Sequence, residues 1–249
     1  MNSSADIRAK TYTREEYVYL AKLYERAERF DDMVYFINKF VELDPNLSHE
    51  ERNILSAGYK NIISGKRASW RLINSMERKE EKKNSPQLEY LKEVKSKIEK
   101  ELTDICSEIQ NVVNKYLLPN AKDSETKVFF LKLQGDYWRY KSEYSTGADF
   151  DEATDQAEAA YVKANEIAEK DIPISSSTRL GLILNFSVFY YEIKNRKEEA
   201  CNLAKNAFDK AMKVLDELEK VKAKDTLLII QLLKENLILW DNEMNDDDH

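Results

Sequence analysis

The chain has 249 residues, of which 34% are charged and 42% hydrophobic, with only five Gly and four Pro. Because so few residues favour tight turns, this composition predicts long amphipathic helices rather than hairpins or disorder. The net charge of −7 argues against a nucleic-acid-binding protein, whose surface would be basic, and it makes a local basic cluster more notable.

Hydrophobic periodicity predicts nine helices joined by short connections, and no segment alternates with the period of a strand. The first helix begins at Thr13, which has the spacing of a capping box with Glu16. Gly147 and Pro173 punctuate two of the joints, and the charge run 79–84 predicts a solvated connection. The expected helices cover about 13–30, 31–43, 48–77, 85–118, 123–145, 150–170, 175–195, 197–218 and 225–241.

These elements predict an all-α fold, an antiparallel array of nine helices. We expect a flexible N-terminal extension over 1–13, a single helical domain over 14–241 and a short acidic, disordered tail over 242–249. Cys106 and Cys201 are too few for a disulfide framework, and both fall at apolar helical positions, so we expect two buried thiols.

The N-terminal residues contain no apolar signal region, and the longest apolar run is far too short to span a bilayer. We therefore expect a cytoplasmic protein, with access to the nucleus, that does not insert into membranes.

Two pairs of side chains interrupt the acidic background. Lys60 and Arg67 are seven residues apart on one predicted helix, which is two turns, so they share a face. Far along the chain, Arg139 has the phenol of Tyr140 beside it.

Two further predicted helices each place one Asn among apolar residues, Asn185 in 179–192 and Asn236 in 231–240. An Asn inside an apolar helix is unfavourable unless its amide is used. Taken in order, segments 52–70, 127–140, 179–193 and 225–240 resemble the 14-3-3 family, and the resemblance extends over about 15–240.

The resemblance implies a concave amphipathic groove that binds phosphoserine or phosphothreonine of client proteins, with a preference for Arg-x-x-phosphoSer-x-Pro. A phosphoserine carries nearly two negative charges and three acceptor oxygens, which suits several cations and a hydroxyl donor. The family's phosphate ligands fall on Lys60, Arg67, Arg139 and Tyr140, and its peptide main-chain ligands on Asn185 and Asn236. The apolar wall of the groove falls on Leu184, Val188, Leu232, Leu239 and Trp240.

Four more side chains are expected to support the basic cluster. Lys132 and Asp136 are four residues apart and so share a helical face. Glu192 follows Asn185 by seven residues, and we expect it to pair with Arg71 or to orient the cluster.

The family also dimerises, with the first helix of one subunit against the third and fourth helices of another. The matching positions predict ion pairs Asp32–Lys97 and Arg29–Glu101 between subunits. Val94 stands where the family commonly has Tyr, which leaves homodimer and heterodimer both open. The expected interface comprises Leu23, Ala27, Arg29, Asp32, Ser69, Ile73, Met76, Val94, Lys97 and Glu101.

Two other functions compete with a phosphoserine-binding adaptor. A helical prenyl-transfer enzyme needs a third Asp after Asp31 and Asp32, where Tyr35 stands, and no metal set, phosphate loop or nucleophile elbow appears. We therefore expect no catalysis and no cofactor. A phosphate-independent scaffold of the tetratricopeptide type would suit the small residues of 159–168, but the repeat pattern of that family is missing.

Overall fold

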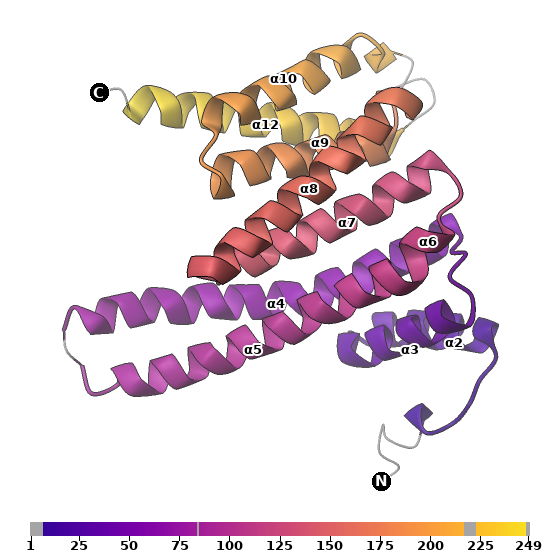
Figure 1. The fold of residues 1–249 in the computed structure, drawn as a ribbon, viewed down its shortest axis with the longest axis horizontal. Helices are drawn as coiled ribbons and strands as arrows, with labels where there is room; N and C mark the ends of the chain where they lie inside the picture. Colours follow the sequence, from indigo (N-terminus) through magenta and orange to yellow (C-terminus); the bar gives the residue numbers. More distant parts are fainter. Residues whose placement is uncertain (1–6, 84, 217–222, 248–249) are drawn as a thin grey trace. The chain divides into compact units, whose positions relative to one another are not determined.

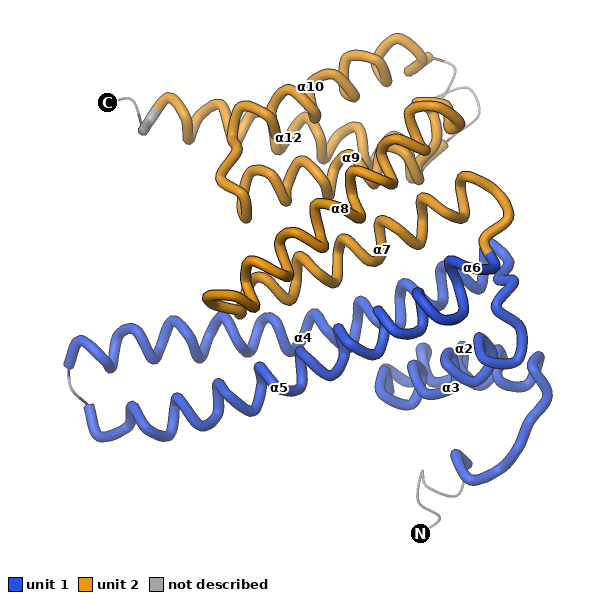
Figure 2. The backbone as a smooth tube through the Cα atoms, viewed as in Figure 1, with its two compact units in different colours: residues 1–120 blue, residues 121–249 orange. Residues whose placement is uncertain are grey.

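The computed structural model describes residues 7–83, 85–216 and 223–247 (Figure 1). Within these ranges the fold consists of nine helices and no strand, which confirms the all-α prediction. The chain divides into two compact units, residues 1–120 and 121–249 (Figure 2), and the single domain expected over 14–241 stays a prediction.

Unit 1 contains two antiparallel helix pairs, each made of helices that follow one another in sequence (Figure 1). The second pair is the longer, and its last helix continues through a π-helical turn. The elements are α2 (Arg14–Arg26), α3 (Phe30–Leu43), α4 (His49–Glu81), α5 (Leu88–Val112), the π-helix η1 (Val113–Leu117) and α6 (Leu118–Asn120).

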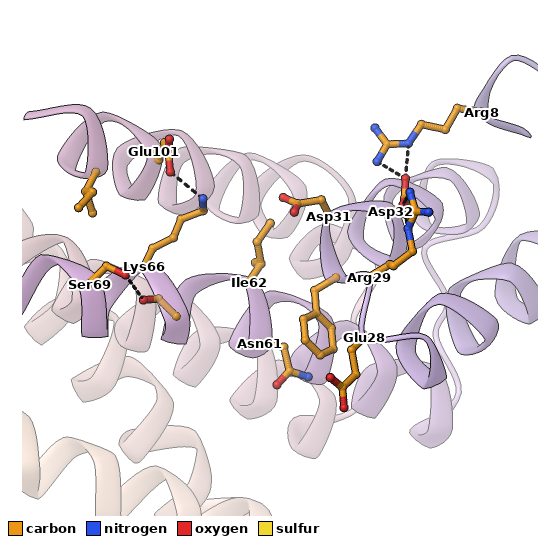
Figure 3. Close-up of a pocket in the computed structure, with 13 residues that line it drawn as sticks. Arg8, Glu28, Arg29, Asp31, Asp32, Asn61, Ile62, Lys66, Ser69 and Glu101 are labelled. Atoms are coloured by element: carbon orange, nitrogen blue, oxygen red, sulfur yellow. Dashed lines mark hydrogen bonds and ion pairs between the residues drawn. The ribbon is translucent and has the colours of Figure 1, made fainter. Parts of the chain in front are cut away.

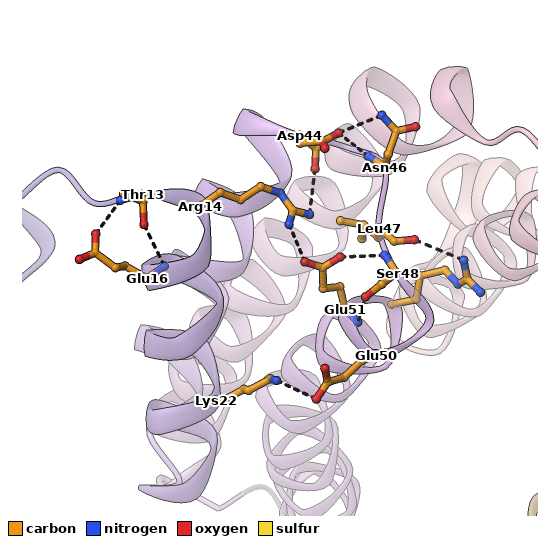
Figure 4. Close-up of polar contacts among 11 residues, drawn as sticks. Thr13, Arg14, Glu16, Lys22, Asp44, Asn46, Leu47, Ser48, Glu50 and Glu51 are labelled. Atoms are coloured by element: carbon orange, nitrogen blue, oxygen red, sulfur yellow. Dashed lines mark hydrogen bonds and ion pairs between the residues drawn. The ribbon is translucent and has the colours of Figure 1, made fainter.

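Capping boxes begin α2 and α4 (Figure 4). Thr13 Oγ1 accepts from the Glu16 backbone N–H, while the Glu16 carboxylate accepts from the Thr13 backbone N–H, which confirms the predicted cap. Ser48 and Glu51 make the same reciprocal pair. Arg14 Nη1 also reaches Glu51 Oε1 at 2.6 Å, so the cap of α4 is tied to α2.

Three helix ends in the two units differ from the prediction. The first helix stops at Arg26 because Glu28 takes a left-handed backbone conformation, with φ of 54°. Helix α4 continues to Glu81, into the charge run predicted as a connection, because Lys and Glu are good helix formers and this turn needs no apolar contact. Helix α8 begins at Gly147, three residues early, since glycine tolerates the positive φ of 57° found there.

The N-terminal residues that the structure describes are packed against α3, although we predicted a flexible extension. Arg8 donates from Nε and Nη2 to Asp32 Oδ1, at 2.9 and 2.6 Å. The backbone oxygen of Arg8 accepts from Tyr35 Oη at 2.9 Å. The prediction for residues 1–6 lies outside the described residues.

Unit 2 contains five α-helices, the third of which continues as a π-helix. They are α7 (Ser124–Ser142), α8 (Gly147–Asp171), α9 (Ser177–Val188), η2 (Phe189–Ile193), α10 (Lys197–Met212) and α12 (Lys224–Asp247). Helices α9, α10 and α12 enclose an apolar core of their own, in which Leu180, Leu233 and several alanines of α10 are fully buried.

Two predictions about unit 2 are wrong. The tail predicted as disordered from residue 242 is helical up to Asp247, and Tyr191 Oη holds it by donating to Glu243 Oε2 at 2.7 Å. Cys201 is only half-buried, whereas Cys106 is buried as expected. Among the described helices, none is long and apolar enough to cross a membrane.

Candidate functional site

Arg139 is a buried cation, with only 7% of its surface exposed. It lies in the last turn of α7, where its Nε donates to Tyr161 Oη at 3.2 Å. Its guanidinium carbon lies 4.7 Å from the ring centroid of Tyr140, so the phenol predicted beside the cation does stack with it. These contacts within unit 2 give Arg139 a defined position.

Asp136 is the anion that holds this cation in place. Asp136 is 5% exposed and lies one turn before Arg139, with Oδ1 3.5 Å from Arg139 Nη2. Oδ2 accepts from Lys132 Nζ at 2.7 Å, which confirms the contact expected from the spacing of Lys132 and Asp136. Two cations therefore share one carboxylate in a largely buried place.

The pKa shifts reflect this arrangement. Burial alone would raise the pKa of Asp136, but the charges of Lys132 and Arg139 outweigh burial and hold it below its usual value. Burial lowers the pKa of Arg139, yet Tyr161 and Asp136 more than offset this, and the pKa lies well above its usual value. Both groups are therefore charged at neutral pH.

Asn185 on α9 joins the same carboxylate. Its Nδ2 donates to Asp136 Oδ1 at 2.8 Å, and the side chain is half-buried. One of its two amide hydrogens is thus already bonded within the protein, and the predicted contact with a peptide would use the other amide groups. Leu184 and Val188, predicted as groove wall, are half-buried on the same helix.

The predicted stripe on α12 divides between two environments. Leu232 and Leu239 are 38% and 52% exposed, and Asn236 is half-buried. Trp240 is only 3% exposed and stacks on Tyr191, with ring centroids 4.5 Å apart. The indole therefore belongs to the core of these helices, and its role as groove wall stays a prediction.

The cations predicted on the other half of the site belong to unit 1. Lys60 is exposed and Arg67 half-buried, and both lie on α4 two turns apart. Arg71, one turn further, is exposed. The convergence of Lys60 and Arg67 with Arg139 on one phosphate stays a prediction.

Glu192, predicted to share a helical face with Asn185, is exposed. Glu192 lies within the π-helix η2, which has a longer turn than an α-helix. Seven residues therefore do not make two whole α-helical turns here, and the support that Glu192 was expected to give the basic cluster stays a prediction.

The predicted dimer residues form a largely exposed surface on unit 1, and four of them line a cavity of about 890 Å³ (Figure 3). Within one chain, Asp32 is bonded by Arg8 and Arg29, and Lys66 Nζ reaches Glu101 Oε2 at 2.7 Å. Ser69, on the wall of the cavity, is exposed. Of the other predicted residues, Ala27 and Lys97 are exposed, Ile73 is half-buried, and Leu23, Met76 and Val94 are 46%, 43% and 45% exposed.

Sequence reasoning missed Tyr161 on α8, which bonds both Arg139 and Asp136. A signal was present, since Tyr161 is the one large side chain on an α8 face made of Ala157, Ala160, Ala164 and Ala168, all buried. In the part of the chain that the structure describes, no group of His, Cys, Asp and Glu is placed to hold a metal ion.

Comparison with known proteins identifies the class of protein that this fold represents. Residues 20–241 match the family model described as 14-3-3 protein, so the chain belongs to the 14-3-3 family. It is 51% identical to 14-3-3 protein epsilon of Drosophila melanogaster, over 93% of this chain and 88% of that protein. It is 48% identical to 14-3-3-like protein B of Vicia faba, over 96% and 92% of the two chains.

A third relative is the checkpoint signal transducer rad24 of Schizosaccharomyces pombe, 49% identical over 94% of this chain and 87% of that protein. As a member of this family, the protein is an adaptor in signalling, and 14-3-3 proteins are non-enzymatic adaptors that bind clients and dimerise.

Proposed function

We propose that this adaptor binds phosphoserine and phosphothreonine of client proteins in the cytoplasm, through Lys60, Arg67, Arg139 and Tyr140. In this proposal Lys60 and Arg67 of α4, together with Arg139 and Tyr140 of α7, contact one phosphate. The two Asn residues, Asn185 and Asn236, hold the peptide main chain on either side of it. The protein acts as a dimer, so two phosphosites on one client gain avidity.

The observation that supports the proposal best is the buried, charged Arg139. Lys132 and Arg139 carry two positive charges against the single negative charge of Asp136, so this cluster is one charge short of neutrality. Of the five N–H donors of Arg139, the Nε–H donates to Tyr161 Oη, and Nη2 lies 3.5 Å from Asp136 Oδ1. A phosphate dianion would supply both the missing charge and the acceptors.

The competing function is a helical scaffold that binds partners whether or not they are phosphorylated. It gains some support from the exposed apolar residues of α12, since Leu232, Ile238 and Leu239 would suit an apolar peptide face. It gives no reason for two cations to share one buried carboxylate, because an apolar partner would leave that excess charge without an anion.

The test is fluorescence anisotropy with one Arg-x-x-Ser-x-Pro peptide in phosphorylated and unphosphorylated form. We expect the wild type to bind only the phosphopeptide, and Lys60→Ala to weaken binding at least about tenfold, since a charge-assisted hydrogen bond contributes ~1.5–3 kcal/mol. Lys60 is preferable to Arg139 as the mutated residue because it is exposed, so its loss leaves no buried partner behind.

The matched control is Lys163→Ala, which removes an exposed Lys from α8 and should leave affinity within about twofold, the usual scale for an isolated surface charge. Equal binding of both peptides by the wild type would instead establish the phosphate-independent scaffold.

A further inference from the structure

We propose that Tyr161 is the positioning residue of the phosphate site, and that it fixes Arg139 and Asn185 together through the shared carboxylate of Asp136. The inference rests on the proposed function and adds to it a residue that does not touch the ligand. It also predicts that the phosphate-binding cation and the peptide-binding amide act as one unit.

The hydroxyl of Tyr161 uses both of its hydrogen-bonding roles. Oη donates to Asp136 Oδ1 at 2.6 Å and accepts from Arg139 Nε at 3.2 Å. All three side chains are buried, so neither bond competes with bulk water. The hydroxyl therefore sets the direction of the guanidinium from its Nε side and leaves the opposite edge of the fork for a ligand.

Asp136 Oδ1 also connects Tyr161 to helix α9. The same oxygen that accepts from Tyr161 also accepts from Asn185 Nδ2 at 2.8 Å. Oδ2 is held separately by Lys132. One carboxylate thus joins side chains of α7, α8 and α9, and a shift of its position would move Arg139 and Asn185 together.

The ring that carries the hydroxyl has no room to move. Tyr161 is fully buried and stacks on Phe186, with centroids 5.3 Å apart, and lies 5.5 Å from Phe189. On the other side Gly135 brings the α7 backbone so close that a Cβ there would stand 2.7 Å from the ring. Apolar packing therefore fixes a polar atom, as a pre-organised binding site requires.

The hydroxyl keeps its proton over the working range of pH. Burial raises the pKa of Tyr161, and the charge of Asp136 raises it further, to well above the usual value. The bond to Asp136 is consequently present whenever that carboxylate is charged.

The experiment compares wild type with Tyr161→Phe, which removes the hydroxyl and keeps the ring. We expect phosphopeptide affinity to fall by about tenfold or more, since a bond to a charged group is lost on each side. The matched control is Tyr59→Phe, since Tyr59 is equally buried and donates to Asn38 Oδ1 in unit 1. It should lose stability but keep affinity.

Two further readouts separate positioning from a general loss of stability. In the nitrogen-15 NMR spectrum, the Arg139 Nε–H should exchange slowly in wild type and rapidly in Tyr161→Phe, in the absence of peptide. In a double mutant with Asn185→Ala, the loss of affinity should be smaller than the product of the two single losses, because both act through Asp136.

A second variant, Gly135→Ala, keeps the hydroxyl and displaces the ring, and it should weaken phosphopeptide binding as well. The proposal is overturned if Tyr161→Phe binds phosphopeptide as wild type does while only its stability falls, or if the two losses multiply. If the wild type did not prefer the phosphopeptide, the proposed function would be refuted instead. The exchange rate of Arg139 Nε–H in wild type and in Tyr161→Phe would still test the positioning, because it is measured without peptide.

Discussion

At the residue scale, Asp136 carries the most direct prediction, because one buried carboxylate pairs with two cations. Its folded pKa lies below the usual value, so the stability it contributes is fully present above the unfolded pKa, about 3.9, and is lost as pH falls through the folded pKa. We expect Asp136→Asn to lower the free energy of unfolding by about 3 kcal/mol at pH 7, since breaking a buried pair leaves Arg139 uncompensated. The difference should shrink below about pH 4.

Urea unfolding of both proteins at several pH values measures this difference. Asp209→Asn is the control, because Asp209 is exposed and its charge takes part in a surface ion pair, with Oδ2 3.9 Å from Lys205 Nζ on the same helix. Its effect should stay within about 0.5 kcal/mol at every pH. Parallel stability curves for wild type and Asp136→Asn down to the lowest pH would show that the Asp136 charge does not stabilise the fold.

At the scale of elements, two helical glycines should respond to alanine in opposite directions. Alanine favours a helix over glycine by about 1 kcal/mol, and a Cβ at Gly65 of α4 would meet no atom within 4 Å. At Gly135 of α7 the same Cβ would stand 2.7 Å from Tyr161, and overpacking of a core costs about 1–3 kcal/mol. We expect the midpoint temperature of thermal unfolding to rise for Gly65→Ala and to fall for Gly135→Ala. A higher midpoint temperature for both variants would contradict the close packing of α7 on α8.

These elements also show what the sequence can predict. The capping box at Thr13 depends on residues three apart, so it could be found from the sequence, as could the contact of Lys132 with Asp136. Tyr161 lies 25 residues from Asp136, and their bond depends on how α7 and α8 pack. The left-handed turn at Glu28 and the π-helix η2 were missed for a related reason, since neither has a composition that marks it.

At the scale of the whole molecule, the unit 1 surface predicted to form a dimer has both charged and apolar residues. Asp32 and Glu101, predicted to pair between subunits, have partners within the chain in Arg8, Arg29 and Lys66. A dimer that formed the predicted pairs would have to exchange these contacts, so the pairs would specify register more than they add stability. The drive to associate would then come from the exposed apolar side chains of the predicted interface, Leu23, Met76 and Val94, which are 46%, 43% and 45% exposed.

Ser69 tests this surface, since it is exposed on α4, lines the cavity beside Lys66 and Glu101, and follows a basic segment that kinases often recognise. A negative charge there would have to be desolvated against an apolar partner and would repel Glu101. We expect Ser69→Glu to shift the protein from dimer towards monomer in sedimentation velocity. Ser64→Glu is the matched control, because Ser64 bonds the carbonyl four residues back just as Ser69 does, yet points about 140° away around the helix. If both variants sediment as wild type does, this face of α4 does not form the subunit contact.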